Sequence, residues 1–119
     1  MTNSEEAKQI LLKVGAVIEN DHFVGTSGQH MSIYVNKDYL LPHTTETARI
    51  TQIMAEANED LNVDVVAAPV VGGAILGNWV AYHLSKLQGN EILSAYADKT
   101  DEGPLVFKRG YDALVKDKK

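Results

Sequence analysis

Cysteine is absent from this chain of 119 residues. The chain therefore has no disulfide framework, no thiolate metal ligand and no thiol nucleophile. Positive charge is scarce as well, because 11 Lys and Arg stand against 16 Asp and Glu and leave a net charge of -5. A general nucleic-acid or membrane-surface binder needs a surplus of basic residues, so the composition disfavours both classes.

Long apolar runs are also missing. No stretch approaches the roughly 18–20 apolar residues that cross a bilayer, and the N-terminal residues MTNSEEAKQ are too acidic and polar for a signal peptide. A hydrophobic content of 45% is still ordinary for a folded chain. The sequence thus predicts one small domain, or part of one, and its lack of cysteine fits a cytoplasmic location.

Several motifs of known chemistry are missing too. The pair Gly72-Gly73 is part of neither a Walker A loop nor a G-x-G-x-x-G fingerprint, and no G-x-S-x-G marks a nucleophilic serine. No two histidines have the spacing of a metal site on a helix, so we expect no metal held by protein side chains. The four histidines are His22, His30, His43 and His83.

The most informative segment is DVVAAPVVGGAILGNWVAYHLSKL, from Asp64 to Leu87. It predicts a short parallel strand, a loop closed by Gly72-Gly73, and an apolar helix that we expect to be well buried. Free backbone N–H groups and the positive end of the helix dipole would then meet in one place, where phosphate binds well. A tight turn that needs glycine and binds nothing is the alternative.

Helical spacing of apolar side chains predicts a helix over residues 4–18, and Asn3 and Glu6 have the spacing of a capping box. Two extended runs within residues 23–36 flank a turn and predict a hairpin or small flap. A second helix is expected over residues 43–59.

The C-terminal third predicts a second central strand over residues 91–97, preceded by a helix C-cap at Gly89. A polar loop over residues 98–104 follows, with weaker order after it. Helix, flap, helix, strand, helix, strand is the beginning of an α/β fold.

Cations and a hydroxyl are the other candidate site groups. Lys99, Lys108 and Arg109 lie in or near the polar loop, and cations on a mobile loop can close over a charged substrate. Ser27 could bind a ligand through its hydroxyl. Solvated surface cations and an ordinary turn serine are the alternatives.

Two motifs in this order resemble the type I phosphoribosyltransferases, and most of all the orotate phosphoribosyltransferases. The first is Phe-x-x-x-Ser-Gly-x-x-x-x-x-Tyr, which starts at Phe23 and ends at Tyr34. The second is Asp-Val-Val-Ala-x-Pro-x-x-Gly-Gly, from Asp64 to Gly73. The resemblance covers roughly residues 5–117 and includes a segment, 95–109, at the place of the family's flexible catalytic loop.

The resemblance implies a Rossmann-like parallel sheet with flanking helices, an N-terminal hood at about residues 19–41 and a core at about residues 43–119. It also implies an enzyme that transfers a phosphoribosyl group from phosphoribosyl pyrophosphate to a nucleobase, orotate, in pyrimidine nucleotide biosynthesis. Mg²⁺ bound through the substrate diphosphate and a homodimer are further implications.

The resemblance also implies the roles of individual residues. It implies that the pyrophosphate is bound by Val70, Val71, Gly72 and Gly73, and that the base is bound by Phe23, Thr26, Ser27, Gly28 and Tyr34. It also implies that Lys99 is the catalytic residue that closes over the leaving group.

The chain departs from the family in two places. The strand that ends in two acidic residues and a Thr-Thr-Gly turn, which binds the ribose 5-phosphate in the family, has no match here. We therefore expect the N-terminal part of a longer enzyme, inactive alone. The loop segment carries only Lys99 as a counterpart of the catalytic lysine, and Thr26 stands where orotate enzymes often have lysine.

These departures leave alternatives open. The chain could be a non-catalytic binding or regulatory module of the same fold, or a purine-type phosphoribosyltransferase. It could also be an interaction scaffold that associates through an unpaired strand edge.

Overall fold

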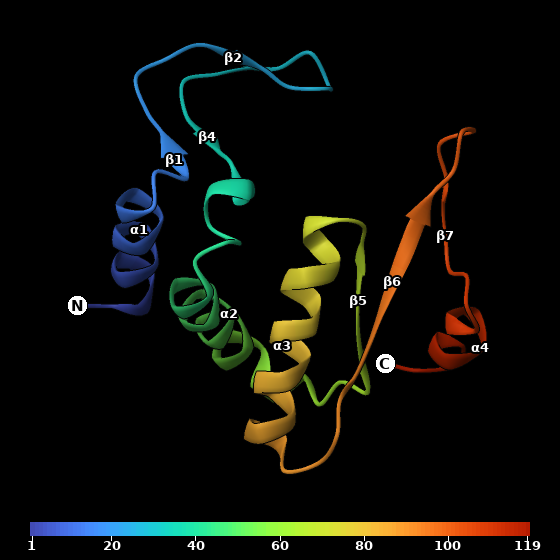
Figure 1. Cartoon of the computed structure of the whole chain (residues 1–119). Coiled ribbons are helices and arrows are strands. Elements are labelled where there is room, and N and C mark those ends of the chain that lie inside the picture. Colours follow the sequence, from blue (N-terminus) through green and yellow to red (C-terminus); the bar gives the residue numbers. More distant parts are fainter. The chain divides into compact units, whose positions relative to one another are not determined.

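The computed structural model describes all residues from Met1 to Lys119. The chain forms two compact units, Met1–Thr47 and Ala48–Lys119 (Figure 1). None of its helices combines the length and hydrophobicity that crossing a bilayer requires. The α-helices are α1 (Asn3–Lys13), α2 (Thr44–Asn58), α3 (Gly72–Gln88) and α4 (Tyr111–Val115), and the 3₁₀ turns are η1 (Lys37–Tyr39) and η2 (Glu59–Leu61). The strands are β1 (Val17–Ile18), β2 (Phe23–Val24), β3 (His30–Met31), β4 (Tyr34–Val35), β5 (Val65–Pro69), β6 (Leu93–Lys99) and β7 (Leu105–Val106).

Helix α1 begins with a capping box. The Thr2 hydroxyl accepts from the Glu5 N–H at 3.1 Å, and the Glu5 carboxylate accepts from the Thr2 N–H at 3.4 Å. The expected box at Asn3 and Glu6 was therefore wrong by one residue. Thr2 is the cap because its backbone is extended, while Asn3 is already helical.

The same helix ends earlier than its apolar periodicity predicts. Gly15 has a φ of +77°, which glycine adopts without strain. Its N–H donates to the Leu12 carbonyl and the Ala16 N–H donates to the Leu11 carbonyl, the two bonds of a Schellman motif. The expected helix over residues 4–18 was therefore too long, and Val17 and Ile18 form a strand instead.

The expected hairpin is confirmed. β2 pairs antiparallel with β3, and β1 pairs antiparallel with β4. The turn is closed by the Gly28 N–H, which donates to the Gly25 carbonyl at 2.9 Å, and Gly28 has a φ of +84°. At the other end, the Asn36 N–H donates to the Ala16 carbonyl at 2.7 Å.

The second unit contains a sheet with the order β5-β6-β7. β5 and β6 are parallel, and β7 is antiparallel to β6. The expected strand over residues 91–97 begins and ends two residues later, and its end is extended because Leu105 and Val106 return to pair with Lys99 and Asp98. Asp98 and Lys99, expected in a loop, therefore belong to a strand.

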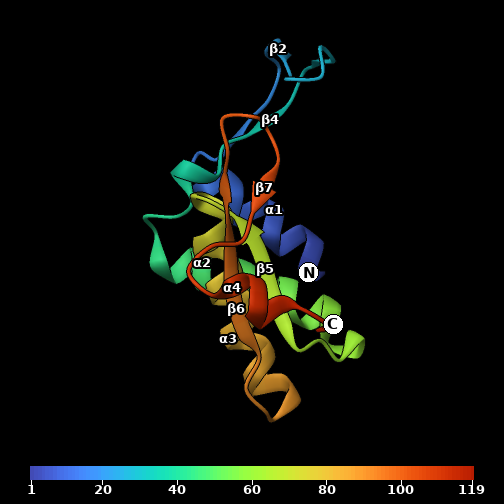
Figure 2. The ribbon, with the colours of Figure 1, turned by 90° about the vertical axis from the view of Figure 1, so that its right-hand side faces the viewer.

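Helix α3 approaches β5 closely (Figure 2). A Cβ placed on Gly77 would lie 3.2 Å from the Ala68 Cβ, and one on Gly73 would lie 3.1 Å from the Pro69 Cδ. The helix ends at Gly89, whose φ of +77° confirms the expected C-cap. The core of this unit consists of Ala55, Val80, Ala81, Leu84 and Ile92, with Val63 and Val66 packed against it.

The expectation that α3 is well buried was wrong. Ile75, Tyr82 and Leu87 are exposed by 42%, 51% and 43%. A helix buries only the stripe of side chains that faces its sheet, and apolar residues on its other faces stay exposed in this chain. Helix α3 therefore leaves large apolar side chains exposed beside the polar Asn78 and Lys86.

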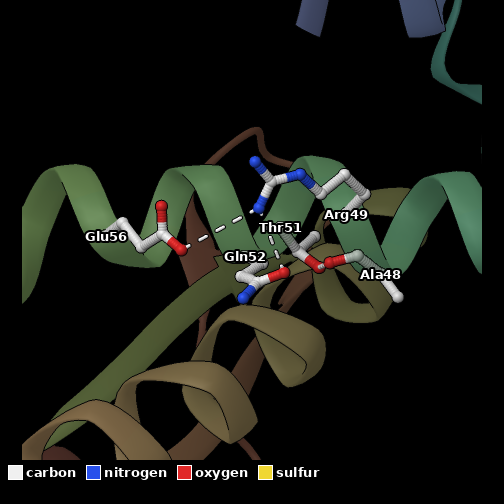
Figure 3. A network of polar contacts seen from close by, with 5 residues as sticks. All are labelled: Ala48, Arg49, Thr51, Gln52 and Glu56. Atoms are coloured by element: carbon white, nitrogen blue, oxygen red, sulfur yellow. Dashed lines mark hydrogen bonds and ion pairs between the residues drawn. The ribbon is translucent and has the colours of Figure 1, made fainter. Parts of the chain in front are cut away.

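Helix α2 confirms the helix expected after Pro42. Its buried Thr51 hydroxyl donates to the Ala48 carbonyl at 3.1 Å. The Arg49 guanidinium donates to the Gln52 side chain at 3.2 Å and lies 3.9 Å from a Glu56 carboxylate oxygen (Figure 3). These contacts link successive turns of one helix and contribute to its local stability.

Candidate active site

The loop between β5 and α3 lies where the carboxyl ends of the parallel strands β5 and β6 meet. Ligands bind at this edge in open α/β sheets. The Val70 N–H is already used, because it donates to the Ala97 carbonyl of β6 at 3.0 Å. The following peptide bond, Val70–Val71, is cis.

The next four backbone N–H groups are free. Val71 is the N-cap of α3, and no side chain caps this helix. The N–H groups of Val71, Gly72, Gly73 and Ala74 have no acceptor within the chain. They are the unsatisfied donors that every helix leaves at its start. With the positive end of the helix dipole they favour an anionic ligand.

Two explanations of Gly72-Gly73, an anion-binding loop and a tight turn that needs glycine, are compatible. Gly73 permits the close packing of α3 on β5, because a side chain there would press on Pro69 at 3.1 Å. This packing also brings the start of the helix to the sheet edge. The glycine thus has a structural role that positions the free N–H groups.

Lys99 is the last residue of β6 and lies at the same edge. It is exposed, and its ammonium has no ion-pair partner within the chain. Because side chains alternate along a strand, Lys99 shares a face with Ala97, whereas Asp98 shares the other face with Tyr96. An unpaired cation at this edge is available to a charged ligand.

Arg109 is not equally available. Its guanidinium forms an ion pair with Asp98 and lies 5.3 Å from the centre of the Tyr96 ring. The hydrogen bond and the charge of Asp98 raise the pKa of Arg109 above its ordinary value. The sequence contained no signal for this pair, because Asp98 and Arg109 meet only through the β6–β7 turn.

The expected base-binding residues lie in the first unit. The structure brings the rings of Phe23 and Tyr34 together, with centroids 5.3 Å apart and planes at 31°. Thr26, Ser27 and Gly28 are exposed in the turn between β2 and β3.

Comparisons of sequence and of structure both match this chain to orotate phosphoribosyltransferases. An orotate phosphoribosyltransferase from a Thermoanaerobacter species is 30% identical over 108 residues, which are 91% of this chain and 53% of that protein. One from Thermus thermophilus is 28% identical over 102 residues, 86% of this chain and 52% of that protein. The crystal structure of the Aeropyrum pernix orotate phosphoribosyltransferase matches with a TM-score of 0.56 at 23% identity, over 84% of this chain and 56% of that one.

The chain resembles orotate phosphoribosyltransferases and shares their fold. The resemblance and the type I phosphoribosyltransferase fold expected from the motifs are thereby confirmed. The chain spans about half the length of the curated relatives it matches. No protein-family model matches it.

One side-chain cluster is not explained by the resemblance to orotate phosphoribosyltransferases. His22 and His30 lie on the two facing sides of the hairpin. Nε2 of His22 is 2.9 Å from Nδ1 of His30. The signal that could have found them is the hairpin register, which places residues on facing strands side by side. No three His, Asp or Glu residues come together as a metal site.

Proposed function

We propose that this chain is part of a phosphoribosyltransferase that transfers the phosphoribosyl group of phosphoribosyl pyrophosphate to orotate, in pyrimidine nucleotide biosynthesis. The observation that supports the proposal is the row of free N–H groups from Val71 to Ala74 at the edge of the parallel strands. It occurs in a chain that is similar to an orotate phosphoribosyltransferase over 91% of its length.

In this proposal the loop binds the diphosphate. The Val71, Gly72 and Gly73 N–H groups donate to its oxygens, and Val70, fixed by its bond to Ala97, holds the loop in place. The Lys99 ammonium acts as the catalytic cation and stabilises the negative charge that grows on the leaving diphosphate. The protein contributes positioning and charge neutralisation rather than covalent chemistry.

The first unit supplies the base-binding residues in this proposal. The Phe23 and Tyr34 rings, in contact at 5.3 Å, offer an aromatic surface to a planar base. The exposed turn residues Thr26, Ser27 and Gly28 offer a hydroxyl or backbone donor to its polar edge. Residues 19–41 would then act as the hood.

Mg²⁺ fits this arrangement, because free backbone donors can hold the diphosphate that carries it and no protein carboxylate cluster is needed. The ion would neutralise charge on the diphosphate. We further propose that the protein forms a homodimer and is located in the cytoplasm.

Diphosphate titration followed by ¹H–¹⁵N NMR tests the proposal. We expect the largest shifts at the amides of Val71, Gly72 and Gly73, because they become hydrogen-bonded to the anion. Lys99→Ala should weaken binding, while Lys8→Ala, which changes an exposed lysine of the other unit, should not. A titration that leaves these three amides unmoved would contradict the proposal.

A second test joins this chain to the part of the Thermoanaerobacter relative that it does not match. We expect such a chimaera to release diphosphate when given phosphoribosyl pyrophosphate and orotate, and Lys99→Ala to lower that rate. Diphosphate release with adenine or hypoxanthine, but not with orotate, would favour a purine-type enzyme instead.

A non-catalytic module of the same fold is the second candidate. It is favoured by the pairing of Arg109 with Asp98, which leaves few free cations at the end of β6. Calorimetry separates the two candidates, because a pure interaction module binds neither diphosphate nor orotate.

A further inference from the structure

We propose that His22 and His30 form a binding site for a divalent transition-metal ion such as Zn²⁺ or Ni²⁺. The site lies in the first unit and is independent of the proposed transferase function. Its evidence is the position of the two imidazole rings on the hairpin.

The hairpin register places both histidines on one face. Phe23 lies opposite Met31 and Val24 opposite His30. His22 precedes β2 directly, so it shares the face of Val24 and lies diagonally across from His30. The backbone pairing continues beyond His22, because the Asp21 N–H donates to the Ser32 carbonyl at 3.4 Å. The two side chains are therefore held together by the ladder on both sides.

The ring nitrogens face each other at the distance that a metal chelate needs. Nε2 of His22 and Nδ1 of His30 lie 2.9 Å apart, with ring centroids 4.8 Å apart. Two imidazole nitrogens at about 2.1 Å from one metal ion are separated by roughly 3.0 Å in adjacent octahedral positions, as Ni²⁺ can offer, and by roughly 3.4 Å in a tetrahedral Zn²⁺ site. A metal ion can thus take the place of this hydrogen bond when each ring turns by roughly 45° to aim its lone pair at the ion, and the ring that donated the hydrogen bond then carries its proton on the other nitrogen.

The donor set selects the class of metal. Neutral imidazole suits Zn²⁺, Ni²⁺ and Cu²⁺, whereas Mg²⁺ prefers oxygen ligands. Both histidines are exposed, so an ion can reach them from solvent and water can fill its remaining positions. A bound ion would connect the two strands on either side of the turn that carries Thr26, Ser27 and Gly28.

Calorimetric titration of the full chain, prepared without a histidine tag, with ZnCl₂ and with NiCl₂ tests the site. We expect one ion to bind per chain. His22→Gln and His30→Gln should each weaken binding by about tenfold or more, since even partners outside the first shell are worth about 10–100-fold. His43→Gln is the matched control, because it removes an exposed histidine outside the hairpin and should leave binding unchanged. MgCl₂ should give no binding that depends on the pair.

Chymotrypsin cleavage at Phe23 and Tyr34 gives a second readout. Zn²⁺ should slow cleavage of the unaltered chain and of His43→Gln, but not of the two hairpin variants, because only the intact pair connects the strands. Equal Zn²⁺ affinity in the unaltered chain and in both hairpin variants, or no binding at all, would overturn the proposal. Neither result would affect the diphosphate test, which concerns the other unit.

Discussion

His83 is an ionisable side chain inside the second unit whose Nε2 is buried without a hydrogen-bond partner. Burial lowers its pKa below the ordinary value, and the charge of Lys86 adds to this, while the Ala48 backbone and Glu56 act in the opposite direction. The ring also stacks on Trp79, with centroids 6.0 Å apart. The fold therefore favours the neutral form of His83.

The free energy of unfolding should consequently fall as the pH falls below about 6.5, the ordinary histidine value. In that range the unfolded chain takes up a proton at His83 before the folded chain does, which stabilises the unfolded state. Urea unfolding at a series of pH values measures the slope. His83→Gln should flatten it between pH 6.5 and the lowered folded pKa, and an unchanged slope in this variant would contradict the assignment.

Gly77 is a second residue whose effect follows from one contact. A Cβ at this position lies 3.2 Å from the Ala68 Cβ and 3.7 Å from a Val66 methyl carbon. Gly77→Val should reduce the free energy of unfolding by about 1–3 kcal/mol, the usual effect of overpacking. Asn78→Val places the same side chain on an exposed neighbouring position of α3 and should cost less. Denaturant titration compares the two, and equal losses would contradict the contact argument.

Among the elements, α1 depends most clearly on its cap, because none of its residues is buried. Thr2→Ala removes the hydroxyl that accepts from the Glu5 N–H and should cost about 1 kcal/mol. Thr2→Ser keeps the acceptor and should change little. Far-UV circular dichroism during thermal unfolding measures the difference, and identical curves for both variants would show that the cap does not contribute.

At the scale of elements, local chemistry explains which predictions succeeded. The turn at Gly28, the helix end at Gly89 and the step from β5 into α3 each depend on residues within one short segment. The end of α1 also depends on one local residue, because Gly15 has the same left-handed backbone. The prediction missed this end because the apolar Val17 and Ile18 continue the helical spacing beyond it.

For the molecule as a whole, the outer edge of β5 is the exposed feature with the clearest consequence. The Asp64 and Val65 N–H groups donate to the Lys119 carbonyl at 2.8 Å and 3.2 Å. Beyond them the Ala67 N–H, which points to the same edge as Val65, has no acceptor. An unpaired strand edge is a template for pairing with another chain.

We therefore expect the chain to self-associate through β5 as its concentration rises. Ala67→Pro removes the unpaired donor and should shift the population towards monomer, because proline is tolerated on strand edges but cannot pair there. Ala67→Ser keeps the donor and should associate as the unaltered chain does. Sedimentation velocity over a range of concentrations measures this, and a clean monomer throughout would count against it.

The sequence by itself determined the order of the elements, the glycine-bounded turns, the strand-loop-helix step at Gly72 and the resemblance to phosphoribosyltransferases. These features depend on backbone preferences and spacing within short segments. Only the tertiary structure decided that Asp98 and Lys99 belong to a strand, that Asp98 holds Arg109, and that His22 meets His30. It also decided that α3 leaves Ile75, Tyr82 and Leu87 exposed. Each of these depends on the exact register and packing of the partner segment, which the spacing of residues along a chain does not fix.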